Sequence, residues 1–294
     1  HCARVKFYLG IPSTNQMENP VVVQTLESEG GLRLRACVEA ACAAGGVVAL
    51  DIEGVDLGRT GEISVVQLAF QADADVLNVF VVDILSKTQD DPLVETLKLL
   101  LEEPSVIKVI HDCRMDSDAL QHKLGITLVS VHDTSCFHQV TQYGSIVNIN
   151  NLMTHHGLPT NAVRDSSVYR RNHAFWATRP LTPRMIEWAG GDVAQILQVR
   201  ELQLQAVLPR MLRKCESMSL DYVNIPRSWL CATFNVRQSS IGRFIGRGGA
   251  TMRALEKRTK TKVYSSGSRG SGKFVCYHES PAGLASVRTK ASSY

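Results

Sequence analysis

The chain has 294 residues, of which 44% are hydrophobic and 20% are charged. This composition is ordinary for a folded protein, and the length suffices for two domains. No apolar run is long enough to cross a bilayer, so we expect no membrane span and no membrane partner. The sequence begins at His1 instead of Met, so we expect a fragment. Whether a targeting segment precedes it stays open.

The charge is distributed unevenly along the chain. Residues 225–294 hold 13 Lys and Arg and two acids, a net charge of +11, which leaves a net charge of −7 on residues 1–224. A basic C-terminal part on an acidic body indicates a polyanionic partner for the C-terminal part. A solvated basic surface is the simpler alternative, so the charge alone does not decide.

The eight cysteines are scattered, and no two of them form a C-x-x-C pair. This spacing excludes a zinc knuckle and a thioredoxin-like redox motif. In a chain of this size, single cysteines are typical of small buried side chains in a reducing compartment. We therefore expect an intracellular protein of the cytoplasm or the nucleus, with the choice between them open.

Hydrophobic periodicity predicts an α/β body after an irregular lead-in over residues 1–20. The expected strands are 21–23, 47–51, 61–71, 76–85, 106–111 and 128–133. The expected helices are 29–44, 92–102, 115–124, 134–143, 151–156 and 181–208. Strands that come first and then alternate with helices indicate a mixed sheet with flanking helices. This body is expected to span residues 21–210, and a linker is expected over 211–228.

Acidic residues fall at the ends of several of these elements. Asp51 and Glu53 lie two residues apart on one strand, so both point to the same side of the sheet. Asp116 stands at a helix start, and Asp192 lies four residues after Trp188 on the long helix. Neighbouring carboxylates repel and need a cation, and oxygen ligands favour Mg²⁺ or Mn²⁺. Taken singly, each acid has a simpler explanation as a solvated loop or helix residue.

The sequence around these acids resembles the DEDD superfamily of 3′–5′ exonucleases over most of residues 21–208. The resemblance rests on blocks in the expected order, namely Val48–Gly54 with Gly61–Leu68, His111–Leu120, and Phe175–Trp176 with Arg179–Leu181 and Met185–Val193. The second and third blocks look most like the Egalitarian-like subgroup of the RNase D branch. The resemblance implies an RNase H-like α/β fold, a mixed sheet with flanking helices.

The same resemblance implies that Asp51, Glu53, Asp116 and Asp192 bind two divalent ions, Mg²⁺ or Mn²⁺. Asp118 is a rival for the third position, because members of the subgroup differ at this point. The implied chemistry is two-metal hydrolysis, in which one ion activates water and the other stabilises the leaving 3′ oxygen. The acidic body is consistent with a domain that holds divalent cations.

One position departs from the family pattern. The RNase D branch has Tyr four residues before the last Asp and a sister branch has His five before it, where this chain has Trp188 and Glu187. The resemblance places Trp188 among the catalytic residues, where a tyrosine hydroxyl would orient the attacking water. An indole N–H cannot accept that proton. Hydrolysis that depends on the metals alone and a non-catalytic scaffold both stay open, and we expect Trp188 to face the carboxylates rather than solvent.

The basic C-terminal part, residues 229–294, has its own succession of elements. The expected strands are 231–237, 262–264 and 273–278, and the expected helices are 239–245, 250–259 and 281–290, with a loop over 265–272. Gly246 and Gly249 form a Gly-x-x-Gly turn before the second helix. This order resembles a type I KH domain, a small α/β fold that binds single-stranded nucleic acid. Glycines let the backbone approach phosphates, and the following helix N-terminus adds positive potential.

The KH resemblance implies a set of nucleic-acid-binding residues. The turn of Gly246, Arg247, Gly248 and Gly249 would follow the phosphates, and three apolar side chains would line a groove for the bases. These three side chains are Ile241, Ile245 and Val263. For each of them, packing in the domain core is the alternative.

The sequence therefore predicts a metal-dependent 3′–5′ exonuclease that acts on single-stranded nucleic acid, with RNA favoured over DNA and a KH domain that holds the strand. The alternative is a non-catalytic RNA-binding adaptor built on a degenerate exonuclease fold. A DNA-repair exonuclease is a third interpretation, because KH domains also bind single-stranded DNA.

Overall fold

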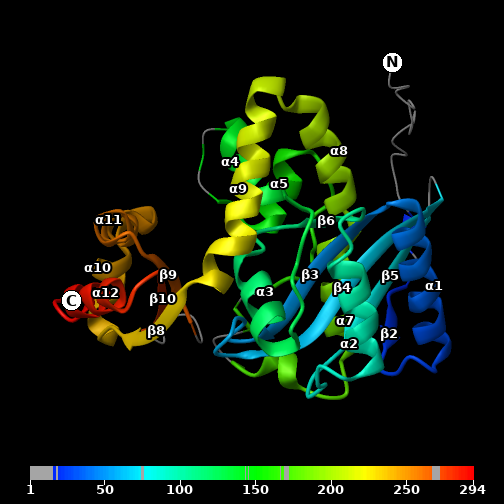
Figure 1. Ribbon diagram of the computed structural model, residues 1–294, viewed down its shortest axis with the longest axis horizontal. Helices are drawn as coiled ribbons and strands as arrows, with labels where there is room; N and C mark the ends of the chain where they lie inside the picture. Colours follow the sequence, from blue (N-terminus) through cyan, green and yellow to red (C-terminus); the bar gives the residue numbers. More distant parts are fainter. Residues whose placement is uncertain are drawn as a thin grey trace.

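The computed structural model describes residues 16–17, 19–73, 76–142, 144, 146–165, 167–168, 172–266 and 272–294. These residues form a large α/β domain and a small C-terminal one, which lie side by side and are joined by a long helix (Figure 1). The predicted lead-in, residues 1–20, falls mostly outside the described residues. Within these described ranges, no helix combines the length and the apolarity that crossing a membrane requires.

The large domain is built on a mixed sheet. Its described strands are β1 (Gln16–Met17), β2 (Val21–Val23), β3 (Val47–Val55), β4 (Glu62–Asp73), β5 (Val76–Asp83), β6 (Ile107–Ile110) and β7 (Val131–Asp133). They are ordered β1-β5-β4-β3-β6-β7, and β2 also pairs with β5. Strand β3 is antiparallel to β4 and parallel to β6. The predicted mixed sheet with flanking helices is confirmed.

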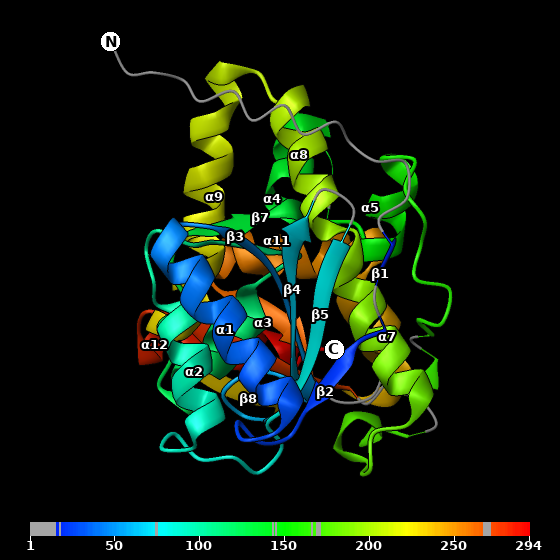
Figure 2. The same cartoon turned by 90° about the vertical axis from the view of Figure 1, so that its right-hand side faces the viewer.

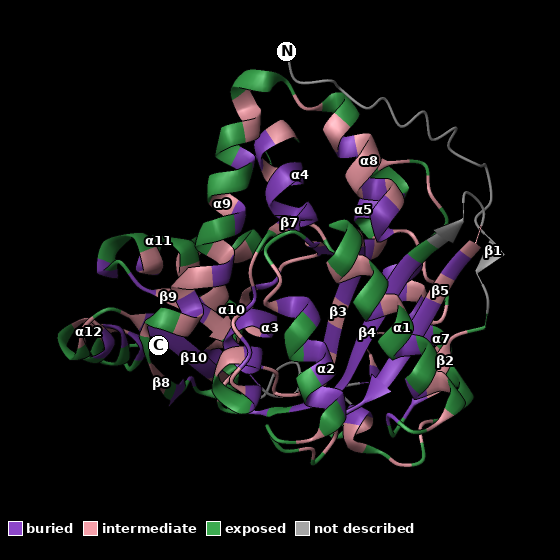
Figure 3. Cartoon of the chain, turned by 45° about the vertical axis from the view of Figure 1, so that its right-hand side comes forward, coloured by how far each residue is buried: buried purple, intermediate pink, exposed green. Residues whose placement is uncertain are grey.

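Helices cover both faces of this sheet. The described ones are α1 (Glu29–Ala44), α2 (Pro92–Leu101), α3 (Arg114–Ala119), α4 (Thr134–Gln142), α5 (Ile149–His155), α7 (Pro183–Ala194), α8 (Ile196–Ala206) and α9 (Pro209–Ser228). Figure 2 shows α1 and α2 on one side of the strands and α7 on the other. The strands between these two layers are largely buried, whereas the outward sides of α1 and α2 are exposed (Figure 3).

The alternation of side chains along β3 decides which face receives the acids. Val48, Leu50 and Ile52 point into the core shared with α1 and α2. Ala49 points to the opposite face, into the core shared with α5 and α8. Because successive strand residues point to opposite faces, Asp51 and Glu53 follow Ala49. The two acids therefore project on the side of the sheet that α7 covers.

Two differences between the predicted and the observed elements concern the end of the large domain. The single helix expected over 181–208 is divided at Gln195 into α7 and α8. The linker expected over 211–228 belongs to the 20-residue helix α9. Proline is favourable in the first turn of a helix, so Pro209 begins α9 instead of preventing it. The buried residues Cys215, Ser219 and Val223 recur every four positions, a spacing that places them on one face of the helix.

The C-terminal domain has a three-stranded sheet with helices on one face. Its described elements are β8 (Leu230–Asn235), α10 (Ile241–Ile245), α11 (Ala250–Thr259), β9 (Lys262–Ser265), β10 (Lys273–His278) and α12 (Pro281–Ala291). The strands are antiparallel in the order β8-β10-β9. Phe234, Phe244 and Phe274 pack together in its core. A small sheet with these helices is the fold expected for a KH domain.

Candidate nuclease centre and nucleic-acid surface

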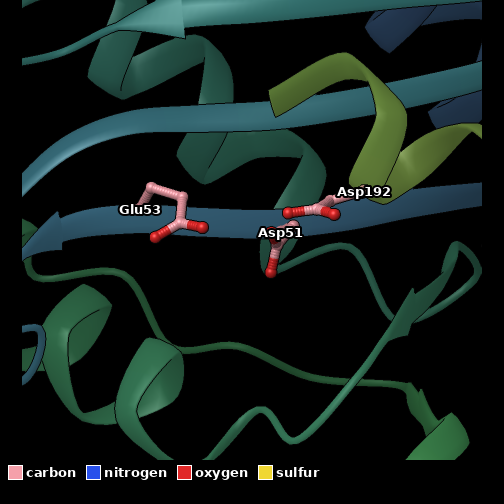
Figure 4. Close-up of side chains that lie close together, drawn as sticks. All are labelled: Asp51, Glu53 and Asp192. Atoms are coloured by element: carbon pink, nitrogen blue, oxygen red, sulfur yellow. The ribbon is translucent and has the colours of Figure 1, made fainter. Parts of the chain in front are cut away.

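Three of the predicted acids converge in the large domain. Asp51 and Glu53 come from β3 and Asp192 from α7, and one carboxylate oxygen of each lies within 4.8 Å of those of the other two. Figure 4 shows the Asp192 carboxylate next to Asp51, with Glu53 further along the strand. We call these three residues the acid cluster. Asp192 thus meets Asp51, 141 residues earlier, and Glu53, 139 residues earlier, because α7 packs across β3, β4 and β5.

Helix α7 can lie this close to the sheet because of its small residues. Its start is fixed by Thr182, whose hydroxyl caps the Met185 N–H, and by Pro183 in the first turn. At Gly190, a Cβ atom would come within 2.4 Å of the Pro20 ring. Glycine at this point therefore brings the last turn of α7, and with it Asp192, against the strands.

The fourth acid, Asp116, lies on α3 and is 6% exposed. Asp51 is the nearby charge with the greatest effect on its pKa. The turn that leads into α3 is held by the buried Asp133, whose carboxylate accepts hydrogen bonds from the Asp112 and Cys113 N–H groups at 3.1 and 2.9 Å. Asp133 was not anticipated from the sequence. Its position at the end of a strand is the signal that could have found it.

Asp118, the rival of Asp116, belongs to the contact between the domains. Its carboxylate accepts three hydrogen bonds from Arg59, at 2.8, 2.9 and 2.7 Å, and one from the Tyr277 hydroxyl at 3.1 Å. Tyr277 lies on β10 of the small domain, and the Arg59 guanidinium stacks 5.3 Å from its ring centroid. The carboxylate of Asp118 is fully buried. With these partners, Asp118 connects the two domains.

The pKa values of Asp51, Asp116 and Asp192 are all raised, so the fold disfavours their charged forms. Burial, followed by repulsion from Asp192, raises the pKa of Asp51 from 3.8 to about 7. Burial and the charge of Asp51 raise the pKa of Asp116 well above its usual range. Burial also raises the pKa of Asp192, although Arg164, Asn161 and Trp188 act against it. A divalent cation would remove this repulsion, and carboxylate oxygens are the ligands that Mg²⁺ and Mn²⁺ prefer, so the residues present fit such an ion.

Trp188 lies as expected, beside Asp192 and away from solvent. Its indole Nε1 donates a hydrogen bond to Asp192 Oδ2 at 2.9 Å, and the side chain is fully buried. Its ring packs 5.6 Å from that of Trp176. The expectation that Trp188 faces the carboxylates is confirmed. Its polar hydrogen is directed at Asp192, which fixes the orientation of that carboxylate.

Two further residues at the acid cluster were not anticipated. Asn161 donates from Nδ2 to Asp192 Oδ1 at 2.9 Å. The Arg164 guanidinium forms a close ion pair with Asp192 and lies 3.7 Å from Glu53 Oε1. Both residues come from the segment after α5, where hydrophobic periodicity is weak. No sequence pattern there pointed to the site.

In the small domain, the predicted glycine turn lies on the surface. Gly246, Gly248 and Gly249 have φ of +75°, +54° and +81°, and a Cβ atom on Gly246 would meet the Thr251 backbone nitrogen at 2.7 Å. Arg247 and Gly248 are exposed at the N-terminal side of α11. A backbone that is accessible at a helix start is suited to phosphate contacts.

The three apolar residues predicted for the groove do not share one environment. Ile241 and Ile245 are partly exposed at the edge of the small-domain core. Val263 is 2% exposed and is a core residue. Strand β9 directs its side chain toward the helices, so the alternative of core packing applies to Val263.

Comparison with known sequences identifies both domains. The model of the 3′-5′ exonuclease family matches residues 33–208, and the model of the KH domain matches residues 232–277. The first match covers more than half of the chain. The chain therefore belongs to the 3′-5′ exonuclease family, and it carries a KH domain after the exonuclease domain.

Individual relatives agree with this assignment. Ribonuclease D of Gluconacetobacter diazotrophicus is 30% identical over 190 residues, which are 64% of this chain and 43% of that protein. The piRNA biogenesis protein EXD1 of Xenopus laevis is 25% identical over 174 residues, 55% of this chain and 38% of that protein. The crystal structure of Trypanosoma brucei RNase D has a TM-score of 0.58 at 26% identity, and the match covers 71% of this chain and 73% of that one. The chain spans less than half of the length of the curated relatives named here.

Proposed function

We propose that the chain is a metal-dependent 3′–5′ exonuclease that acts on single-stranded nucleic acid, with RNA favoured over DNA. The convergence of Asp51, Glu53 and Asp192 within 4.8 Å is the observation that carries this proposal. Acids that repel one another persist in a fold when they have a task that needs their charge, and metal binding is such a task.

In this proposal, Asp51, Glu53, Asp116 and Asp192 hold the ions, which would be Mg²⁺ or Mn²⁺. Bound ions of this kind supply an activated water and stabilise the charge on the leaving oxygen. The residues of the chain fix the geometry of the carboxylates. Trp188 and Asn161 both donate hydrogen bonds to Asp192, one to each oxygen, so the plane of that carboxylate is set before any ion binds.

The KH domain would hold the strand near the acid cluster. Its exposed turn at Gly246–Gly249 supports contacts to phosphates, and Arg247 adds a positive charge. The domain is docked through Tyr277, and Lys273 of β10 lies 3.7 Å from Asp56, which directly follows the strand of Asp51 and Glu53. A docked binding module raises the effective concentration of the strand at the neighbouring site. RNA is favoured because Trypanosoma brucei RNase D, a solved relative, has been crystallised in complex with RNA U12.

A second function, a non-catalytic adaptor that binds RNA, is favoured by one observation. Position 188 carries an indole whose N–H is engaged by Asp192, so it offers no acceptor to an attacking water. On this interpretation, the exonuclease domain is a platform for the KH domain. Positioned proton-transfer groups commonly contribute about 10²–10⁴-fold to a rate, so the loss of one leaves room for slow hydrolysis.

A nuclease assay separates the two functions. The chain is incubated with 5′-labelled single-stranded RNA or DNA in the presence of Mg²⁺, Mn²⁺ or a chelator. The exonuclease proposal expects stepwise shortening from the 3′ end that needs the metal and disappears in Asp51→Asn. If RNA binding persists and no metal-dependent shortening occurs, the adaptor is correct and the exonuclease proposal is refuted.

A further inference from the structure

Arg164 places a positive charge inside the acid cluster. Its Nη1 atom is paired with Asp192 Oδ2 and lies 3.7 Å from Glu53 Oε1. Its guanidinium carbon lies 5.6 Å from the centroid of the Trp188 ring. The side chain is 31% exposed, so it extends from solvent into the cluster. The guanidinium thus neutralises the acids from the side that remains open to water.

Asp192 is crowded by this arrangement. Its Oδ1 accepts from Asn161, and its Oδ2 accepts from both Trp188 and Arg164. A carboxylate has about four lone-pair positions, so three described donors leave it about one. A divalent ion at the cluster would need oxygen lone pairs of Asp192, and it would be repelled by the guanidinium beside it. Arg164 and a metal ion therefore require the same acids.

The position of Arg164 is fixed by the backbone that precedes it. Asn150 on α5 and Asn161 form two reciprocal hydrogen bonds, from Asn161 N to Asn150 Oδ1 at 2.9 Å and from Asn150 Nδ2 to Asn161 O at 3.0 Å. The Arg164 N–H then bonds to Asn161 O at 3.3 Å. These contacts attach the segment to α5 and direct it over the cluster. Only the long Arg164 side chain has to move for the cluster to open.

We propose that Arg164 is an internal counterion that competes with divalent metal for the acid cluster, which rests on the proposed metal-dependent function. When the guanidinium is paired with Asp192, the cluster is neutralised without metal and the site is closed to it. When metal binds, Arg164 withdraws toward solvent. The metal affinity is then set by the difference between the free energies with which the metal ion and the guanidinium bind the same carboxylates. Arg164 therefore sets the concentration of free metal that the protein needs to fill the site.

The test measures Mn²⁺ binding to the full chain by titration calorimetry. We expect Arg164→Gln to bind Mn²⁺ more tightly than the parent, on the order of tenfold, which is within the usual range of coupling between two ligands. Arg164→Lys keeps a cation at the position and should remain close to the parent. Arg184→Gln is the matched control, because Arg184 also pairs with an aspartate, Asp165, at 3.5 Å, but on the exposed surface.

The thermal transition of the metal-free protein gives a second readout that does not depend on activity. Arg164→Gln should lower it, because the acids lose their counterion, and added Mn²⁺ should restore it. Equal or weaker Mn²⁺ binding in Arg164→Gln than in the parent overturns the inference while leaving the proposed function in place. If neither protein binds Mn²⁺, the metal-dependent function and the inference are both refuted. Binding by Arg164→Gln alone supports the inference and assigns the parent a closed site.

Discussion

The raised pKa of Asp51 makes the stability of the metal-free protein depend on pH in a defined direction. An unfolded aspartate releases its proton near pH 3.8, whereas Asp51 in the fold does so at about 7. Between these values the native state binds more protons than the unfolded state, so the free energy of unfolding falls as the pH rises. Above pH 7 both states are ionised and the loss is complete.

The size of the effect follows from the shift. A shift of about 3 units at about 1.36 kcal/mol each corresponds to about 4 kcal/mol at pH 8. At pH 5 the native carboxyl keeps its proton while the unfolded one has released it. The free energy of unfolding is then about 1–2 kcal/mol lower than at a pH below both pKa values. Asp51→Asn removes the charge and retains the shape. We expect it to stabilise the metal-free protein at pH 8 by about 2–3 kcal/mol more than at pH 5.

Denaturant unfolding followed by tryptophan fluorescence measures this difference. Trp176 and Trp188 pack together within the exonuclease domain, so in a Trp229→Phe background the signal reports on that domain. Asp90→Asn is the control, because Asp90 is an exposed aspartate just before α2, and it should show no pH-dependent gain. If Asp51→Asn gives the same change at both pH values, or destabilises the protein at pH 8, the explanation of the raised pKa by burial and by repulsion from Asp192 is wrong.

Three more predictions address Trp188, the domain contact and the KH turn. Trp188→Tyr should raise turnover by up to about 10²–10⁴-fold in the nuclease assay and Trp188→Phe should not; equal turnover in parent, Tyr and Phe variants refutes a water-orienting role for this position. Asp118→Ala should lower the free energy of unfolding by about 3–5 kcal/mol, because it removes the counterion of the Arg59 guanidinium, whose remaining bond to Pro226 O does not balance its charge, and the carboxylate acceptor of the Tyr277 hydroxyl. Tyr277→Phe should cost only about 1 kcal/mol, and a similar small loss in Asp118→Ala would contradict the buried pairing. Replacing Arg247 and Gly248 together by Asp should weaken single-strand binding and flatten its salt dependence, while the domain stays folded with a small drop in the thermal transition, because Gly248 has a φ of +54°. Unchanged affinity would exclude this turn from the binding surface.

Most elements of the fold could be predicted because their side chains repeat with the period of the structure they form. The helix predicted over residues 29–44 agrees with α1 at both ends, since Ser28 caps its first turn and Gly45, at φ +69°, ends it. The strand predicted over residues 273–278 agrees with β10. Helix α9 was not predicted because the stretch from Pro209 that contains Pro226 was interpreted as a linker; Pro209 is compatible with a helix start, and Pro226 lies within the last turn of the helix.

The acids of β3 and α7 could also be found from the sequence, since the period of a strand puts Asp51 and Glu53 on one face and the motif order implied Asp192. The choice between Asp116 and Asp118 could not be made in this way. Both lie on the same short helix, and they differ in their neighbours. Asp116 lies near Asp51, whereas Asp118 accepts hydrogen bonds from Arg59 and Tyr277. Such partners lie far away in sequence, and they become neighbours only when the large domain folds or, for Tyr277, when the small domain docks on it.

Arg164 could not be predicted as a site residue either, and its position explains why sequence patterns fail at this site. A periodic pattern records which face of an element is buried, whereas a segment without a period is placed by individual hydrogen bonds. Here those bonds join Asn161 to Asn150, eleven residues earlier, and to Asp192, thirty-one residues later. A cation that must be able to leave a cluster of acids is better carried by such a segment than by a strand or helix, because a long side chain there can move without disturbing the core. The property that would let Arg164 act as a competitor for metal is therefore the same one that hides it from sequence patterns.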